Sequence, residues 1–216
     1  RHGVLLLLDE VMCGMGRTGT THAWEQEGVS PDIQVVAKGL GGGYQPIGAV
    51  LASARVTQAL ARGSGGLRHG FTYMGHPLAC AAALAVQRVI AEDCLLDNVA
   101  AMGSLLLSRL RDRFADHRHV FDIRGRGLLV AIELSADGNT GTPFPEAARV
   151  ADRIRTQAMD LGLACYPGSG TVDGTLGDHV LLAPPYIATA DDIAMIVSRL
   201  GDAVDRVCQD VMRAVP

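Results

Sequence analysis

The sequence contains no apolar segment long enough to cross a membrane as a helix. Its longest apolar runs are Val4–Leu8 and Leu78–Val86, well short of the roughly 20 residues that a bilayer requires. It also lacks a basic cluster, and its formal net charge is −4, so it offers no electrostatic surface for nucleic acid or an anionic membrane. We therefore expect neither membrane nor nucleic acid among its partners.

Closely spaced cysteines are absent as well. The five cysteines are scattered, without a Cys-x-x-Cys pair, so the sequence predicts neither a disulfide framework nor a zinc site. His117 and His119 lie two residues apart but have no third ligand nearby, and we expect them to be exposed to solvent. No metal is predicted, and unpaired thiols favour a reducing, cytoplasmic location.

The composition that remains is that of a folded protein. Hydrophobic residues make up 48% of the 216 positions and charged residues 19%, which suits a chain with a sizeable core and one or two domains. The chain opens with Arg1 and runs almost at once into the apolar segment Val4–Leu8. A natural protein rarely starts at a buried strand, so we expect further residues before Arg1.

The first part of the sequence has the alternating pattern of an α/β domain. Apolar runs predict three strands, at Val4–Leu8, Ile33–Ala37 and Ile47–Ala52. The first is continuous, which is typical of a strand buried on both faces of a parallel sheet. A short helix around Ala23–Glu27 is predicted between the first two strands, with Gly28 ending it. Ser53 is a candidate cap for the helix after the third strand.

The second part predicts a small α/β domain. A helix at 77–91 is expected to end the first part; in the second part, helices are expected at 95–114, 146–161 and 190 to about 212, and short strands at 120–123, 128–134, 163–166 and 180–182. Thr189 is predicted to cap the final helix. We place the domain boundary between residues 92 and 93.

Two residues with complementary chemistry follow the first two strands. Asp9 and Lys38 are 29 residues apart (38 − 9), an interval that fits a loop, a short helix and a strand. Both would meet at the carboxyl edge of one sheet, where α/β folds place their sites. We expect a poorly solvated Lys38, which favours the neutral amine needed for a Schiff base, and a buried Asp9 that pairs with a cation such as a protonated ring nitrogen.

Three longer motifs extend this pattern. They are Leu8–Gly19 (LDEVMCGMGRTG), Ala37–Ala49 (AKGLGGGYQPIGA) and His69–Ala79 (HGFTYMGHPLA). They resemble, in order, the aspartate motif, the lysine motif and a phosphate-contact segment of the class III aminotransferases. Two short segments, Arg124–Leu128 and Ala183–Pro185, are similar to parts of that family's small domain.

The resemblance implies a fold-type-I pyridoxal 5'-phosphate (PLP) transferase. Residues 1–92 would be the C-terminal part of the PLP-binding large domain, with a mainly parallel sheet, and residues 93–216 the small C-terminal domain. The implied reaction moves an amino group from an amino acid or amine donor to a 2-oxo acid.

The resemblance also implies a role for four residues. Lys38 would form the Schiff base and shuttle a proton, and Asp9 would pair with the pyridine nitrogen. Val11 would pack on one face of the ring. Thr72 would donate its hydroxyl to the PLP phosphate of a partner subunit, which implies a homodimer with shared active sites.

The sequence departs from the family pattern in three places. Met12 stands where many relatives have a glutamine, and His179–Leu182, before the Ala-Pro-Pro segment, lacks the arginine of carboxylate-specific relatives. This loss of bidentate carboxylate recognition favours an ω-amino acid or amine donor. The phosphate cup and the second ring-stacking residue of the family have no counterpart, so we expect this chain as given to bind PLP poorly.

Other interpretations remain open from the sequence. An apolar strand ending in Asp9-Glu10 is also typical of an ATPase that uses the pair for magnesium binding and hydrolysis, although no Gly-Lys-Ser/Thr phosphate loop is present. An aminomutase or racemase would use the same lysine and aspartate. An inactive remnant of the family is a further possibility.

Overall fold

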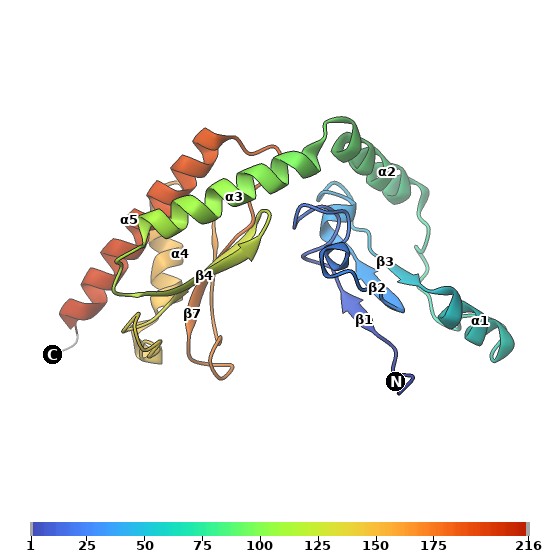
Figure 1. Cartoon of the computed structure of the whole chain (residues 1–216), viewed down its shortest axis with the longest axis horizontal. Helices are drawn as coiled ribbons and strands as arrows, with labels where there is room; N and C mark the ends of the chain where they lie inside the picture. Colours follow the sequence, from blue (N-terminus) through green and yellow to red (C-terminus); the bar gives the residue numbers. More distant parts are fainter. Residues whose placement is uncertain (1, 215–216) are drawn as a thin grey trace. The chain divides into compact units, whose positions relative to one another are not determined.

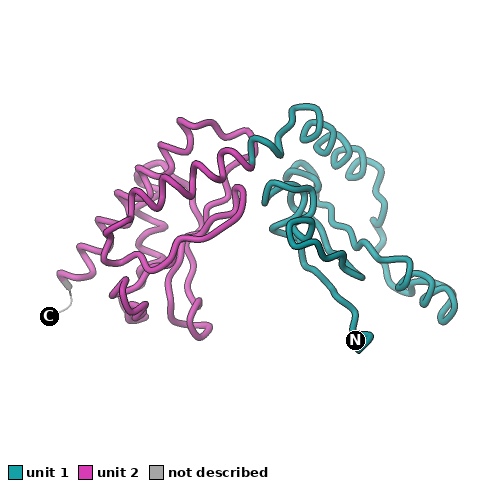
Figure 2. The backbone as a smooth tube through the Cα atoms, in the orientation of Figure 1, with its two compact units in different colours: residues 1–99 teal, residues 100–216 magenta. Residues whose placement is uncertain are grey.

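The computed structural model describes residues 2–214, so the expectation of residues before Arg1 lies outside the described part. The chain forms two compact units, residues 1–99 and 100–216 (Figure 2). The division falls inside helix α3 (Leu95–Arg113). The predicted boundary at 92/93, and the assignment of the two parts to a large and a small domain, stay predictions.

The N-terminal unit contains a three-stranded sheet (Figure 1). Its strands are β1 (Leu7–Asp9), β2 (Ile33–Val36) and β3 (Ala49–Ala52), in the order β1-β2-β3. Strands β1 and β2 are parallel, with Asp9 opposite Val35, whereas β3 runs antiparallel to β2. The two parallel strands therefore end at the same edge of the sheet.

The prediction of a buried strand at Val4–Leu8 was wrong in extent and in burial. Strand β1 is only Leu7–Asp9, and the side chains before it are exposed, from 81% at Val4 to 37% at Leu6. The physical reason is that β1 lies at the edge of its sheet and pairs only with β2 among the described strands. Nothing within residues 2–214 covers these apolar side chains.

The helices of the N-terminal unit are the 3-10 helices η1 (Ala23–Glu27) and η2 (Lys38–Leu40) and the α-helices α1 (Ala54–Arg62) and α2 (Pro77–Glu92). Two of them, η1 and α2, begin and end close to the predicted positions, and α1 follows Ser53 as predicted, whereas η2 was not predicted. Gly28 ends η1 in the left-handed conformation with φ 64°, as expected for a helix-ending glycine. Ser53 occupies the N-cap position of α1, but its hydroxyl makes no capping hydrogen bond.

The C-terminal unit combines a four-stranded antiparallel sheet with three long helices. The strands are β4 (Val120–Arg126), β5 (Leu129–Leu134), β6 (Tyr166–Ser169) and β7 (Asp178–Leu182), in the order β4-β5-β7-β6. The helical segments after α3 are η3 (Glu146–Ala148), α4 (Val150–Asp160) and α5 (Ala190–Ala214). The helix predicted at 146–161 is interrupted because Arg149 adopts φ 48°, and the strand predicted at 163–166 lies at 166–169 instead.

Alternate residues of the central strands form the core of this unit. Val130, Ile132 and Leu134 of β5 are buried, as are Val180 and Leu182 of β7, which is the pattern of a sheet covered on one face. The start of α5 is fixed as predicted, because Thr189 and Asp192 cap each other's backbone amides at 3.2 and 2.8 Å. No helix in the described part of the chain is both long and apolar enough to cross a membrane.

Candidate active site

The structure brings Asp9 and Lys38 to the same edge of the N-terminal sheet. Asp9 is the last residue of β1 and lies opposite Val35 of β2. Lys38 begins η2, two residues after β2 ends at Val36 (38 − 36) and three residues beyond Val35 (38 − 35). Because β1 and β2 are hydrogen-bonded neighbours that run in the same direction, a primary amine and a carboxylate follow adjacent strand ends.

The backbone at Lys38 is held in a conformation that non-glycine residues rarely adopt. Its φ is 37°, in the sparsely populated left-handed region, and such outliers cluster at functional sites. The Gln87 side chain of α2 donates to the carbonyls of Gly39 and Leu40 at 3.1 and 3.0 Å. These contacts fix the turn that presents Lys38.

The turn also requires a glycine three residues after the lysine. A Cβ at Gly41 would lie 2.7 Å from the Ile47 side chain and 2.9 Å from the Gln45 carbonyl. The chain therefore folds back closely after Lys38, and a larger residue at Gly41 would displace it.

Asp9 is oriented by the loop that follows it. The Val11 amide donates to Asp9 Oδ1 at 3.0 Å, and the Cys13 thiol lies 3.9 Å from the Asp9 carbonyl oxygen. Burial, with the charges of Glu10 and Asp9, raises the pKa of the Cys13 thiol, so this cysteine is not a thiolate nucleophile at neutral pH.

The expectations of a poorly solvated Lys38 and a buried Asp9 were wrong for this chain. Both residues are exposed, as is Thr72 in the segment between α1 and α2, while Val11 is half-buried. The reason is that nothing in the described part of the chain covers this edge of the sheet. The roles of Val11 and Thr72 at a cofactor stay predictions.

Sequence reasoning missed the buried network around Glu10, which is only 3% exposed. Its carboxylate accepts hydrogen bonds from the amides of Ala23 and Trp24 at the start of η1 and from Gln34 Nε2, each at 2.9 Å. The available signal was a polar residue, Gln34, inside the otherwise apolar strand β2. Since all three bonds are made within the fold, Glu10 is unsuited to activate a water molecule.

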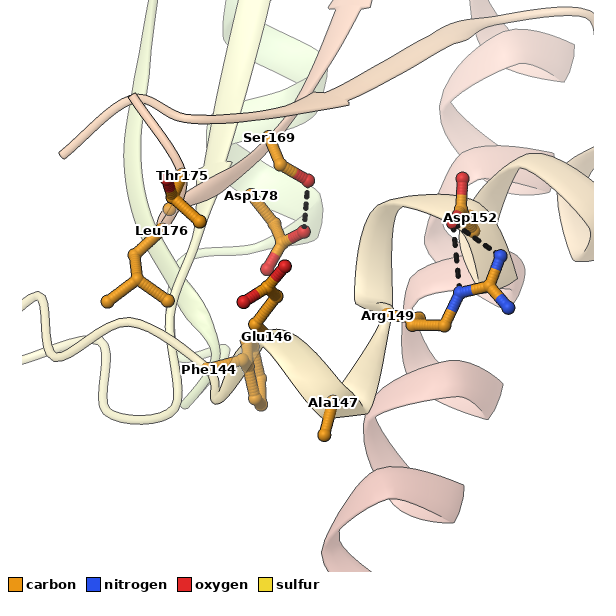
Figure 3. Close-up of a pocket in the computed structure, with 10 residues that line it drawn as sticks. Phe144, Glu146, Ala147, Arg149, Asp152, Ser169, Thr175, Leu176 and Asp178 are labelled. Atoms are coloured by element: carbon orange, nitrogen blue, oxygen red, sulfur yellow. Dashed lines mark hydrogen bonds and ion pairs between the residues drawn. The ribbon is translucent and has the colours of Figure 1, made fainter. Parts of the chain in front are cut away.

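A separate cavity of about 520 Å³ lies in the C-terminal unit, where Figure 3 shows its lining side chains. Two of its carboxylates are bonded to neighbouring groups. Asp178 accepts from Ser169 Oγ and the Ala151 amide, and Asp152 pairs with Arg149. The cavity contains none of the residues that the sequence singled out for chemistry.

The two closely spaced histidines are not exposed, contrary to expectation. His119 is 8% exposed, and its ring Nδ1 lies 3.0 Å from the Ala136 carbonyl. His117 donates toward Asp205 at 3.1 Å. Both rings are therefore used in packing, and no group of three or more possible metal ligands occurs among the residues described.

Comparison with known proteins now identifies the class of protein. The profile described as Aminotransferase class-III matches residues 1–204. The chain is 50% identical over 205 residues to a protein of Gibberella zeae named "Aminotransferase", covering 94% of this chain and 40% of that protein. The chain therefore belongs to the class III aminotransferase family.

Solved structures agree with this assignment. A transaminase from the marine bacterium Virgibacillus has a TM-score of 0.89 at 37% identity, covering 96% of this chain and 46% of that chain. The omega transaminase from Pseudomonas jessenii in complex with PMP has a TM-score of 0.86 at 36% identity, covering 98% and 45%. The expected α/β fold of a class III transaminase is confirmed, and the chain spans less than half the length of these relatives. The ATPase alternative is not favoured.

Proposed function

We propose that this chain forms part of a PLP-dependent transaminase in which Lys38 carries the cofactor and Asp9 faces the ring nitrogen. The observation that supports the proposal most strongly is the placement of an amine and a carboxylate after adjacent parallel strands. Family membership supplies the second support, because it makes amino-group transfer the expected reaction class.

The residues present fit the chemistry of PLP. The amine of Lys38 suits the aldehyde of PLP, and the carboxylate of Asp9 suits its pyridine nitrogen. The hydroxyl of Thr72 suits its phosphate. When bound, PLP supplies an electron-withdrawing ring that stabilises negative charge at the substrate's α-carbon.

In the proposed mechanism three side chains would hold the cofactor and serve the reaction. Lys38 would hold the cofactor through its Nζ and would carry the proton at the substrate's α-carbon. The carboxylate of Asp9, oriented by the Val11 amide, would pair with the ring nitrogen. Val11 would pack against one face of the ring.

For the substrates, we propose an ω-amino acid or amine donor and a 2-oxo acid acceptor. The support is that β7, which leads into the Ala-Pro-Pro segment, contains no arginine. A planar guanidinium is the group best suited to bind an α-carboxylate in bidentate fashion, and this strand cannot offer one.

We also propose a homodimer with shared active sites, in which Thr72 reaches the phosphate of the partner subunit. The apolar side chains on either side of it, Phe71, Tyr73 and Met74, are each about 70% exposed (70%, 71% and 67%). Exposed apolar side chains in one segment are typical of a surface that is covered by another chain. A cytoplasmic location remains part of the proposal, because all five cysteines are free.

The proposal is tested by amino transfer in the full-length protein. With an amine donor and a 2-oxo acid, we expect the amino product to appear in alternating half-reactions, and Lys38→Ala to lose turnover by several orders of magnitude. Gln58→Ala, on the exposed surface of α1, is the control and should retain activity. Retained turnover in Lys38→Ala would overturn the site, and a rearranged or racemised donor without acceptor would indicate an aminomutase or racemase instead.

A further inference from the structure

Glu10, which follows Asp9 in the sequence, belongs to a buried hydrogen-bond network that none of the proposed catalytic steps uses. Glu10 Oε2 accepts from the Ala23 amide and from Gln34 Nε2, and Glu10 Oε1 accepts from the Trp24 amide, all at 2.9 Å. Glu10 and Gln34 are 3% and 4% exposed. A buried carboxylate with three donors is firmly held, because each bond to a charged group is stronger than a neutral one.

Two aromatic side chains complete the network. Trp24 Nε1 donates to Gln34 Oε1 at 3.2 Å, and Gln34 Nε2 lies 2.8 Å from His22 Nδ1, which therefore accepts from the amide. The rings of His22 and Trp24 stack at 5.7 Å with planes 7° apart. Every polar group of Gln34 is thus bonded, and the start of η1 is fixed against β2.

The network closes the loop that orients Asp9. Residues 10–22 connect β1 to η1, and Glu10, at one end of this segment, bonds to the start of η1 at the other end. The Glu10 backbone donates to the Val35 carbonyl at 2.9 Å and accepts from the Gly14 amide at 3.0 Å. A Cβ at Gly14 would lie 2.9 Å from the Glu10 side chain, so the loop wraps tightly around this carboxylate. The Val11 amide that bonds Asp9 lies inside this closed segment.

We propose that Glu10 is a positioning residue, which fixes the Val11 amide against Asp9 Oδ1 and thereby sets the orientation of Asp9 toward the ring nitrogen of the cofactor. This inference rests on the proposed function. Glu10 acts through Val11 and Asp9 and touches neither substrate nor cofactor. Its two neighbours in the sequence are the residues that the proposed mechanism places at the ring.

The test compares Glu10→Gln with the native full-length protein loaded with PLP. The amide nitrogen of glutamine would face a backbone N–H where the carboxylate oxygen had accepted one, so at least one bond is lost and one donor is opposed. We expect the pH midpoint of the bound cofactor's absorption to shift by about one pH unit, since a lost bond near a charged group changes a titration by roughly that amount. Turnover should fall by about tenfold or more with KM little changed.

The matched control is Asp178→Asn. Asp178 is also a buried carboxylate that accepts a backbone amide at the start of a helix and one side-chain donor, but it lies in the C-terminal unit. The Asp178→Asn variant should lower the unfolding temperature as Glu10→Gln does, but it should leave the pH midpoint of the cofactor's absorption unchanged. Amide hydrogen exchange around Val11 should quicken at least tenfold in Glu10→Gln and stay unchanged in Asp178→Asn.

Gln34→Met keeps the inference testable if Glu10→Gln does not fold. It removes one of the three donors to Glu10, so its absorption midpoint should move in the same direction by a smaller amount. The positioning role would be overturned if a folded Glu10→Gln or Gln34→Met protein kept the native absorption midpoint and the native rate of amide exchange at Val11. It would also be overturned if Asp178→Asn shifted the absorption midpoint as much as Glu10→Gln does. Failure of the proposed function is distinct, because the native protein would then show no cofactor absorption.

Discussion

Replacing Gly103 with alanine tests a close backbone approach in the C-terminal unit. Gly103 lies within α3 and is buried, and a Cβ there would lie 2.3 Å from the Gly127 carbonyl oxygen and 2.6 Å from its Cα. An ordinary contact needs 3.4 Å or more, so the helix and the β4–β5 turn must separate by about 1 Å. Gly127 is held at φ 51° and cannot easily move away.

Two effects of opposite sign determine how much Gly103→Ala changes the free energy of unfolding. Alanine is favoured over glycine inside a helix by about 1 kcal/mol. Forcing extra atoms into a packed contact costs typically 1–3 kcal/mol, and more where backbone must shift, so we expect a net loss of about 2 kcal/mol. For a unit of this size that corresponds to a fall of about 8 °C in unfolding temperature.

Thermal unfolding followed by circular dichroism measures this fall. Ser104→Ala is the control, because Ser104 is the exposed neighbour whose hydroxyl bonds only to the Ala100 carbonyl of its own helix. It should change the unfolding temperature by no more than about 2 °C, as surface substitutions usually do. A Gly103→Ala protein as stable as the native one would show that the close approach to Gly127 is absent.

Two further predictions concern titration. Burial lowers the pKa of His117; the charge of Asp205 opposes this effect, whereas those of His119 and Arg113 reinforce it. Near neutral pH the folded state therefore binds fewer protons than the unfolded state. The free energy of unfolding should decrease as pH falls below about 6.5, the ordinary pKa of histidine. As pH is lowered from 8 to 5, the free energy of unfolding should fall more steeply in the native protein than in His117→Gln. Parallel plots of this free energy against pH for the two proteins would contradict the prediction. Burial raises the pKa of Cys208 to about 12, so a thiol reagent at pH 8 should label the exposed cysteines in peptide maps but reach Cys208 only after unfolding; early labelling would refute its burial.

The positions where several helices begin or end were predictable from the sequence, because local residues determine them. Pro77 begins α2, Gly28 ends η1 and Thr189 caps α5, since each depends on a backbone preference or on a partner within four residues. The interruption at Arg149, where φ is 48°, was not predictable, because residues 146–161 contain no glycine or proline that would mark a break in the helix.

Burial was the least predictable property, because it depends on what covers a surface. The apolar run before Asp9 has the pattern of a doubly buried strand, yet Val4 is 81% exposed. The same lack of cover explains why Lys38 and Asp9 are exposed. Conversely, the sequence offered Glu10 only as half of an acidic pair suited to magnesium binding and hydrolysis, and only the positions of η1 and Gln34 reveal that its carboxylate is enclosed.

The most direct test of the central claim is to trap the cofactor on its lysine. The full-length protein is incubated with PLP, reduced with borohydride, digested and analysed by mass spectrometry. We predict that the peptide containing Lys38, the only lysine in this chain, gains the mass of the reduced cofactor, and that Asp9→Ala still carries the label. A native protein whose Lys38 peptide stays unmodified would contradict the proposed active site.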